Sequence, residues 1–285
     1  MPLVFVLVWS TGFVVARYGM PHAPPMRFLA LRYLLSVLCF CVWIAWVRAA
    51  WPRTPRQWGH LALTGVLMHA GYLGGVWAAV KHGIGAGTVA LIVGLQPLLT
   101  ALWVNARARD SQVTGRQWLG LSLGLAGLLL VVWHKLGAGE LSAANLILAL
   151  GALASITVGT LYQKHFVAPC DVRTANTVQL LAALLVTLPF ALLETEPIVL
   201  HVELVGAMAW SVLVLTLGGS SLLYLLIQRG AATRVTSLLY LVPPCTAVLA
   251  WGLFGEALTI EAVGGVLITV AGVALVVREP AVPRG

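Results

Sequence analysis

Apolar runs and short polar gaps alternate along the whole chain. A helix needs about 20 mostly apolar residues, each rising about 1.5 Å, to cross roughly 30 Å of bilayer hydrocarbon. The first run lacks both a basic start and an Ala-x-Ala-like cleavage site, so we expect a span there rather than a signal peptide. The pattern predicts an all-α integral membrane protein with ten transmembrane helices. They cover about residues 2–18, 27–47, 58–80, 85–105, 115–133, 143–164, 174–193, 203–227, 234–254 and 260–278.

The chain also repeats itself once, at an offset of about 146 residues. The aligned segments are VGLQPLLTALW (93–103) with LYLVPPCTAVL (239–249), and GLSLGLAGLLLVV (120–132) with GVLITVAGVALVV (265–277). Internal duplication of a hydrophobic chain is typical of transporters. It predicts two units of five helices each, over residues 5–133 and 143–278.

The basic residues sort between the two sides of this topology. Twelve of them lie in the gaps after the second, fourth, sixth and eighth spans or after the last span: Arg48, Arg53, Arg56, Arg107, Arg109, Arg116, Lys164, Arg173, Arg229, Arg234, Arg278 and Arg284. On the other side they are four, namely Arg17, Arg27, Lys81 and Lys135. The positive-inside rule assigns the first group, and with it both termini, to the cytoplasm.

Five spans are an odd number, so the second unit must enter the membrane from the opposite side to the first. Matched gaps should then carry opposite charge. The basic gap from Arg48 to Arg56 aligns with the acidic gap from Glu194 to Glu203. The two units are therefore predicted to be inverted repeats.

Composition narrows the class of protein further. The chain is 60% hydrophobic and 9% charged, with a mean hydropathy of +0.96, which is too little charge to cover a soluble domain of 285 residues. Its formal charge of +8 lies in short gaps, as membrane topology demands, so we expect a lipid bilayer and no nucleic acid as partner. The four cysteines form no CxxC or Cys/His pattern, so we expect no disulfide framework, metal site or cofactor.

Several segments resemble the EamA family of the drug/metabolite transporter superfamily. They are VWSTGFVVARYG, PPMRFLALRYLLS, VGLQPLLTALW, and LLYLVPPCTAVLAWGLFGEALT followed by GGVLITVAGVALVV. The first unit departs from the last motif, because Arg109 and Asp110 stand where the second has Gly255 and Glu256. That difference weakens a shared role for the carboxylate. The resemblance covers nearly the whole chain.

This resemblance implies ten helices, a central cavity between the halves, and alternating access. It also implies export or exchange of small polar metabolites such as amino acids. We expect a multi-pass protein of the bacterial plasma (inner) membrane.

Two prolines lie at matched positions inside predicted spans, Pro97 in the fourth and Pro243 in the ninth. A proline removes a backbone donor and frees a carbonyl of the preceding turn. That carbonyl can face the cavity, or the kink can serve packing, and the sequence favours neither. Gln96 either contacts a polar solute or, slightly favoured, forms an interhelical hydrogen bond.

Polar and aromatic side chains mark the third and eighth spans. His69 and Tyr72 are three residues apart and share one helix face, and Ser220 and Tyr224 lie at similar depth in the matched span. They are candidates for cavity walls; the alternative is helix packing with the tyrosine hydroxyls bonded to neighbours. Weaker candidates are Trp9 and Tyr240.

Arg32 lies about five residues into the second span. Either it snorkels to the surface, or it pairs with a carbonyl or an anionic group such as a substrate carboxylate. Its counterpart in the second unit is Gln179, as Thr216 is the counterpart of His69. A charge or an imidazole present in only one copy is better evidence for the solute that is carried than for the moving parts that both copies share.

The middle of every span lacks Asp and Glu, so the usual coupling carboxylate is missing. Proton coupling would then fall to His69, whose imidazole titrates near neutral pH in water. Facilitated diffusion or exchange fits equally well. The chain has no GxxxxGK[ST] motif, which argues against ATP-driven transport.

These features predict a carrier that moves small polar metabolites, amino acids or related compounds, by export and alternating access. An intramembrane enzyme would need a nucleophile–base pair or metal ligands such as HExxH, and the sequence has none. A receptor or scaffold would not require inverted duplication. We therefore expect a transporter and not an enzyme.

Overall fold

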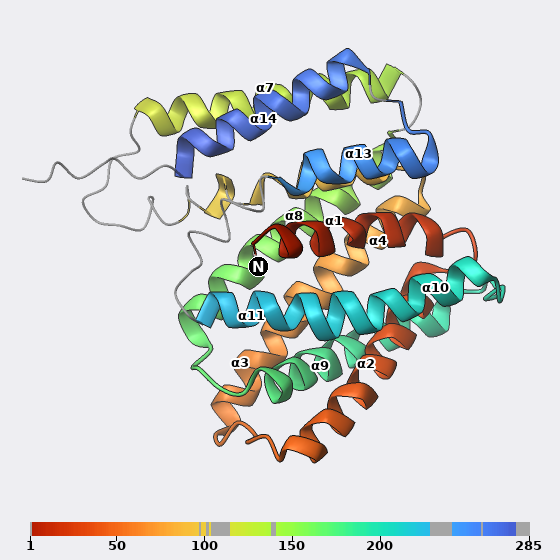
Figure 1. Ribbon diagram of the computed structural model, residues 1–285, viewed down its shortest axis with the longest axis vertical. Helices are drawn as coiled ribbons and strands as arrows, with labels where there is room; N and C mark the ends of the chain where they lie inside the picture. The colour runs from red at the N-terminus through yellow and green to blue at the C-terminus, as the bar shows by residue number, and fades with distance from the viewer. Residues whose placement is uncertain are drawn as a thin grey trace, which may run out of the picture.

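The computed structural model describes residues 2–96, 98–100, 103, 115–137, 141–228, 241–257 and 259–277, and all their regular structure is helical. The first half contains α1 (Pro2–Gly19), α2 (Pro25–Val47), α3 (Pro55–Gly65), the π-helix η1 (Val66–Gly71), α4 (Tyr72–Lys81), α5 (Ala86–Val93) and α7 (Gly115–Gly137). The second half contains α8 (Ala143–Phe166), α9 (Val172–Leu193), α10 (Val202–Trp210), the π-helix η2 (Ser211–Ser220), α11 (Ser221–Gln228), α13 (Val242–Phe254) and α14 (Ile260–Val277). Figure 1 shows α7 and α14 along one edge of the bundle and α2 at the opposite edge.

Local sequence explains where several helices begin. α2 begins at Pro25. Proline is well tolerated there because the N–H groups of the first turn have no partner within the helix. Ser142 and Asn145 form a capping box at the start of α8. Asp171 caps α9 by accepting a hydrogen bond from the backbone N–H of Arg173, at 2.9 Å.

The bundle is apolar outside and partly polar inside. Leu38, Val42 and Trp46 of α2 are exposed, whereas Arg32 and Ser36 of the same helix are buried. Soluble proteins rarely expose large continuous apolar faces, whereas lipid requires them. Five helical stretches are long and apolar enough to cross a membrane: Pro25–Val47, Pro55–Lys81, Ala143–Phe166, Val172–Leu193 and Val202–Leu225. Shorter apolar stretches lie in α5, α7, α13 and α14. The predicted all-α membrane class is thereby supported.

Two of the membrane-length stretches contain a π-helix in their middle, which the sequence pattern had not indicated. η1 interrupts Pro55–Lys81 between α3 and α4, and η2 interrupts Val202–Leu225 between α10 and α11. η1 begins at Val66 and η2 begins at Ser211, so their starts are separated by about the repeat offset. π-Helical turns are rare in proteins overall, and those that occur are often found at functional sites.

Helices α7 and α14 lie side by side and approach through glycines (Figure 1). A Cβ atom on Gly127 would lie 2.5 Å from the carbonyl oxygen of Gly265, and a Cβ on Gly272 would lie 2.5 Å from that of Gly120. Gly120 aligns with Gly265, and Gly127 with Gly272, so the two contacts exchange partners between the halves. Any larger residue would push these backbones apart.

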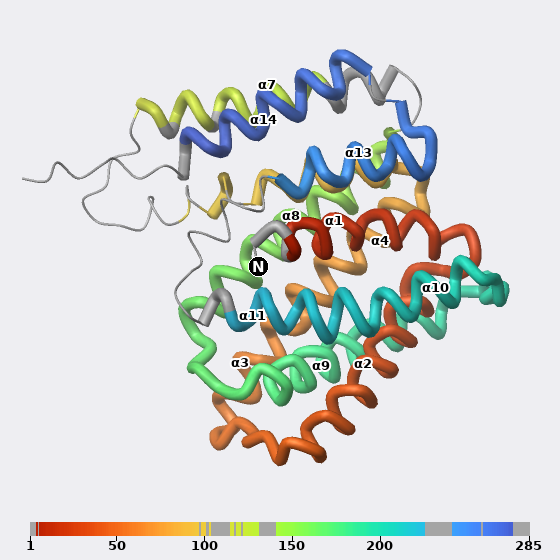
Figure 2. Tube along the Cα trace, viewed as in Figure 1, coloured from red at the N-terminus to blue at the C-terminus, as the bar shows by residue number. Residues whose placement is uncertain are grey.

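The chain turns at two ends of the bundle (Figure 2). We call one of them the glutamate end, because Glu194, Glu196, Glu203 and Glu256 lie there, in or next to the turns after α9 and α13. The turns after α1 and α4 lie at the same end, since Lys81 donates a hydrogen bond to the carbonyl of Met20, at 3.2 Å. The turns after α2 and α8 lie at the opposite end (Figure 2).

Candidate functional site

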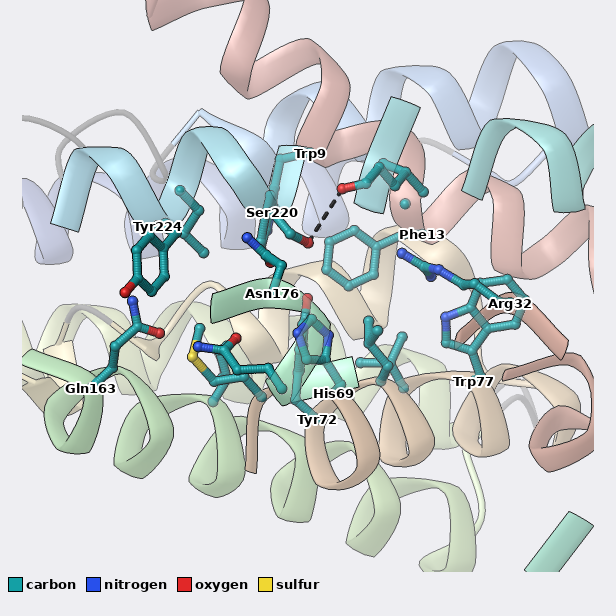
Figure 3. Close-up of a pocket in the computed structure, with 18 residues that line it drawn as sticks. Trp9, Phe13, Arg32, His69, Tyr72, Trp77, Gln163, Asn176, Ser220 and Tyr224 are labelled. Carbon is teal, nitrogen blue, oxygen red and sulfur yellow. Dashed lines mark hydrogen bonds between the residues drawn. The ribbon is translucent and has the colours of Figure 1, made fainter. Parts of the chain in front are cut away.

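A narrow cavity lies between the two halves of the chain (Figure 3). Its volume is about 60 Å³, which is room for several water molecules. Helices α1, α2 and α4 and η1 line it from the first half, and α8, α9, α11 and η2 line it from the second. Its polar lining residues are Arg32, His69, Gln163, Asn176, Gln179 and Ser220, and its aromatic ones are Trp9, Phe13, Tyr72, Trp77 and Tyr224.

The cavity runs along the bundle. Arg32 and Trp77 stand at one end of the group of side chains, and Gln163 and Tyr224 stand at the other (Figure 3). Arg32 lies two turns into α2 from the glutamate end, whereas Gln163 lies in the last turn of α8, toward the opposite end. The cavity therefore begins one to two helical turns inside the glutamate end and reaches toward the opposite end.

The side chain of Arg32 turns into the protein instead of snorkelling. It is only 4% exposed, and its Nε donates a hydrogen bond to the hydroxyl of Thr216 in η2, at 3.1 Å. Its guanidinium carbon also lies 6.0 Å from the centre of the Trp77 ring, within the range of a cation–π contact. Arg32 thus joins the first half to the π-helix of the second.

His69 makes the matching connection in the opposite direction. It lies in η1, it is buried, and its ring lies beside the side chain of Gln179 in α9, which lines the same cavity. The amide nitrogen of Gln179 is itself buried without a hydrogen-bond partner. The backbone carbonyl of His69 accepts a hydrogen bond from the hydroxyl of Tyr33, at 2.9 Å, which fixes η1 against α2.

Backbone packing brings these groups together. Gly65, next to η1, faces the backbone of Gln179, and a Cβ on it would collide with the Gln179 carbonyl oxygen. Only glycine allows α3 and α9 to approach so closely. The imidazole of His69, four residues further along, is therefore held beside α9.

The remaining predicted cavity residues lie on the same walls. Tyr72 is buried and interacts with the side chain of Trp9. Ser220 donates a hydrogen bond to the carbonyl of Leu215, at 3.3 Å, within η2. The hydroxyl of Tyr224 lies 3.0 Å from the sulfur of Cys170, in the turn after α8.

Two predicted residues lie elsewhere. The side-chain nitrogen of Gln96 donates to the hydroxyl of Thr160 in α8, at 3.0 Å, which is the interhelical bond that the sequence slightly favoured. Pro243 is buried in the first turn of α13, against Gly94, and does not line the cavity. Pro97 and Tyr240 lie outside the described residues.

Phe13, Trp77, Gln163 and Asn176 also line the cavity, although they were not among the residues predicted to do so. A search for amides inside apolar runs would have found Gln163 and Asn176, because an amide in a membrane span needs a partner. No such signal marks Phe13 or Trp77. Aromatic residues are common on helix faces that pack against each other, and only the structure places these two beside Arg32.

Carboxylates of the second half bind the first half at the glutamate end. Glu194 accepts hydrogen bonds from the backbone N–H groups of Met26 and Arg27, at 2.9 and 2.8 Å, and so caps α2. Glu256 caps α5 in the same way through the N–H of Ala86, at 2.9 Å.

Two ion pairs reinforce these caps. Glu196 pairs with Lys81 at 2.6 Å, and Glu203 pairs with His22 at 2.9 Å. Within the described ranges, His22, His201 and Glu203 are the one group of three that could hold a metal ion, and here they contact one another. The four carboxylates thus join the two halves at this end of the bundle.

A helical bundle with an apolar outer surface and a polar internal cavity defines a class of membrane protein that handles solutes. Comparison with known families agrees. The model of the EamA-like transporter family matches residues 1–133 and 144–278. The chain belongs to this family, and with it to the drug/metabolite transporter superfamily, so it is an integral membrane transporter.

Curated relatives extend this match. A probable amino-acid metabolite efflux pump of Salmonella typhimurium is 25% identical, over 95% of this chain and 91% of its own length. An uncharacterized inner membrane transporter of Escherichia coli is 26% identical, over 89% of this chain and 81% of its own. One crystal structure shares the fold, with a TM-score of 0.69 and 17% identity over 96% of this chain and 94% of that one.

Proposed function

We propose that this protein is a carrier that exports small polar metabolites, amino acids or related compounds, by alternating access. The observation that carries the proposal is the cavity between the two halves, with polar side chains contributed by both. A scaffold would not need a buried arginine and histidine there, because each is costly to place inside a membrane. The relative from Salmonella typhimurium, named a probable amino-acid metabolite efflux pump, supports amino acids and related compounds as substrates.

The carrier is proposed to consist of ten transmembrane helices in two inverted repeats, residues 5–133 and 143–278. Contacts that occur twice, with the roles of the two halves exchanged, support this proposal. The pair Arg32–Thr216 has its counterpart in Gln179–His69, because Arg32 aligns with Gln179 and Thr216 with His69. The reciprocal glycine contacts of α7 and α14, and the matched π-helices, follow the same rule.

Alternating access is supported by the difference between the two ends. Four carboxylates close the glutamate end, while the cavity extends toward the other end. If both termini are cytoplasmic, as the loop charges predict, the glutamate end is external and the cavity reaches toward the cytoplasm. An exporter loads its substrate from that side. The proposed location is the bacterial inner membrane.

Flux measurements test the carrier proposal. The purified protein, reconstituted in proteoliposomes, should carry hits from a metabolite screen that compares cells with and without it. Empty liposomes are the control. Absence of flux for every member of a broad panel of amino acids, organic acids and neutral solutes would contradict the proposal.

Proton coupling, if this carrier uses it, is proposed to require His69. The residue lines the cavity, and no Asp or Glu lines it among the described residues. His69→Ala should abolish any acceleration of flux by an imposed pH gradient, while flux without a gradient persists. Gradient-driven flux that survives in His69→Ala would eliminate this residue as the proton site.

A further inference from the structure

The guanidinium of Arg32 is a buried charge without a counterion. Among the described residues no carboxylate forms an ion pair with it, and none lines the cavity that it faces. A guanidinium keeps its proton at neutral pH, so the charge cannot be removed by deprotonation. Burying an unpaired charge is strongly unfavourable, which indicates that an anion from outside the chain completes the site.

The geometry leaves the end of the side chain available. Only Nε is engaged, by Thr216, whose own hydroxyl donates to the carbonyl of Ser211 five residues earlier in η2. The two terminal nitrogens of Arg32 donate no hydrogen bond to any described residue, and Figure 3 shows the guanidinium pointing into the group of cavity side chains. Two parallel N–H groups match the two oxygens of a carboxylate.

The charges of the cavity favour one kind of anion. We infer that the cavity selects a small organic monoanion, a carboxylate whose body carries no positive charge, with the carboxylate bound to Arg32. This inference rests on the proposed carrier function and narrows its substrates to organic acids among the small polar metabolites, in place of the amino acids themselves. A monoanion makes the loaded cavity neutral, whereas an amino-acid zwitterion brings an ammonium that no described carboxylate would balance.

The other walls fit the body of such a ligand. Phe13 and Trp77 provide apolar surface beside Arg32. Gln163 and Tyr224 at the far end, and Asn176 between the two ends, provide neutral groups that bind a hydroxyl, keto or acyl oxygen. The narrowness of the cavity favours a ligand of few atoms over an extended one. A carboxylate fits better than a phosphate monoester, because the latter brings nearly two negative charges at pH 7 against one arginine.

Three solutes of similar size but different charge test whether the cavity selects a monoanion. L-lactate is a monoanion, L-alanine is a zwitterion and L-lactamide is neutral, and all three have the same carbon skeleton. In proteoliposomes of the full chain at pH 7, lactate should move at least about tenfold faster than alanine or lactamide, the size of effect that one charged hydrogen-bonded contact commonly gives. Inorganic phosphate serves as the fourth probe and should compete poorly with lactate.

Variants assign the selectivity to the residue. Arg32→Gln keeps polarity but removes the charge, and should abolish the preference for lactate. Arg32→Lys keeps the charge but lacks the two parallel N–H groups of the guanidinium. Thr216→Val removes the hydroxyl that orients the Arg32 side chain. Both variants should give an intermediate preference for lactate. Arg53→Gln, which changes an exposed arginine before α3, is the matched control and should behave as the unaltered protein.

Binding provides a check that does not depend on flux. Lactate should raise the melting temperature of the purified protein in detergent, and should not raise that of Arg32→Gln. Equal flux of lactate and alanine, or a lactate preference that persists in Arg32→Gln, overturns the inference while leaving the carrier proposal intact. Failure of all metabolites in the wider panel would instead overturn the carrier proposal itself.

Discussion

Arg32, Thr216, His69 and Gln179 show how single side chains connect the halves of this protein. Each contact joins α2 or α9 to a π-helix of the other half, at equivalent positions. The chemistry of the two contacts differs, because one copy has a guanidinium and the other an amide. The two contacts therefore occupy equivalent positions, but only the first half contributes a charge. Such a site would hold a ligand with one charged end in a single orientation.

Asp171 is the residue that starts α9, the helix that carries Asn176 and Gln179 into the cavity. The ion pair with Arg173, at 2.6 Å, holds the pKa of the Asp171 carboxyl below its usual range. Asp171→Ala should lower stability by about 1 kcal/mol at pH 7, the usual value of a lost N-cap. Thermal unfolding in detergent measures this difference.

The pH dependence of that difference has a definite sign. A carboxyl with a lowered folded-state pKa contributes stability that is fully present above its unfolded value, 3.8, and is lost as the pH falls through the folded value. The gap in melting temperature between the natural chain and Asp171→Ala should thus be constant from pH 7 to about 5 and narrow below about 4. A gap that widens on acidification would contradict the assigned ion pair.

At the scale of elements, two features set the cavity: the π-helices and the glycine contacts. η2 brings Thr216 to Arg32 and Ser220 to the cavity wall. The contact of α7 with α14 joins the two halves away from the cavity (Figure 1). Helices in a membrane gain stability from close van der Waals packing rather than from the hydrophobic effect, so small residues at such contacts matter most.

Gly127→Ala tests this contact. Its added Cβ would lie 2.5 Å from the Gly265 carbonyl oxygen, so the helices must separate, and stability should fall by roughly 1–3 kcal/mol. Gly264→Ala is the matched control, because a Cβ at Gly264 of α14 meets nothing within 4 Å and alanine favours a helix. Melting temperatures that fall equally in both variants would show that Gly127 is not a packing contact.

At the scale of the whole molecule, closure of the glutamate end depends on bonds between the halves. Glu194 and Glu256 cap helices of the first half, so separating the halves exposes two helix N-termini as well as two ion pairs. These interactions lie at the protein surface and each contributes modestly. Their sum gives a closed end that can still open, which an alternating-access carrier needs.

Glu194→Ala should make the cavity more accessible from the glutamate end. Loss of a cap worth about 0.5–2 kcal/mol shifts the ratio of open to closed molecules by roughly two- to thirtyfold. The measurement uses Ser220→Cys in a background in which the four natural cysteines are replaced, labelled by a membrane-impermeant thiol reagent from each side. Thr195→Ala, at the exposed neighbouring position, should leave labelling unchanged; equal labelling in both variants would show that Glu194 does not hold this end closed.

Much of this architecture could be predicted from the sequence because it depends on local composition. The length of the apolar runs predicted membrane helices, and the motifs from VGLQPLLTALW to GGVLITVAGVALVV indicated the family that the comparison confirms. Polarity within apolar runs also identified Arg32, His69 and Tyr224, which the structure places on the cavity. A charge or imidazole in hydrocarbon is costly wherever it points, so its presence alone is informative.

Only the tertiary structure decided how these residues are used. Gln96 and Arg32 are both polar residues in apolar runs, yet Gln96 is occupied by Thr160 whereas the guanidinium of Arg32 faces the cavity. The π-helices, the place of Trp77 and the carboxylate caps depend on contacts between segments far apart in the chain. Sequence periodicity records which face of a helix is apolar, but it does not record which distant backbone or side chain meets that face, and at this cavity those meetings determine the chemistry.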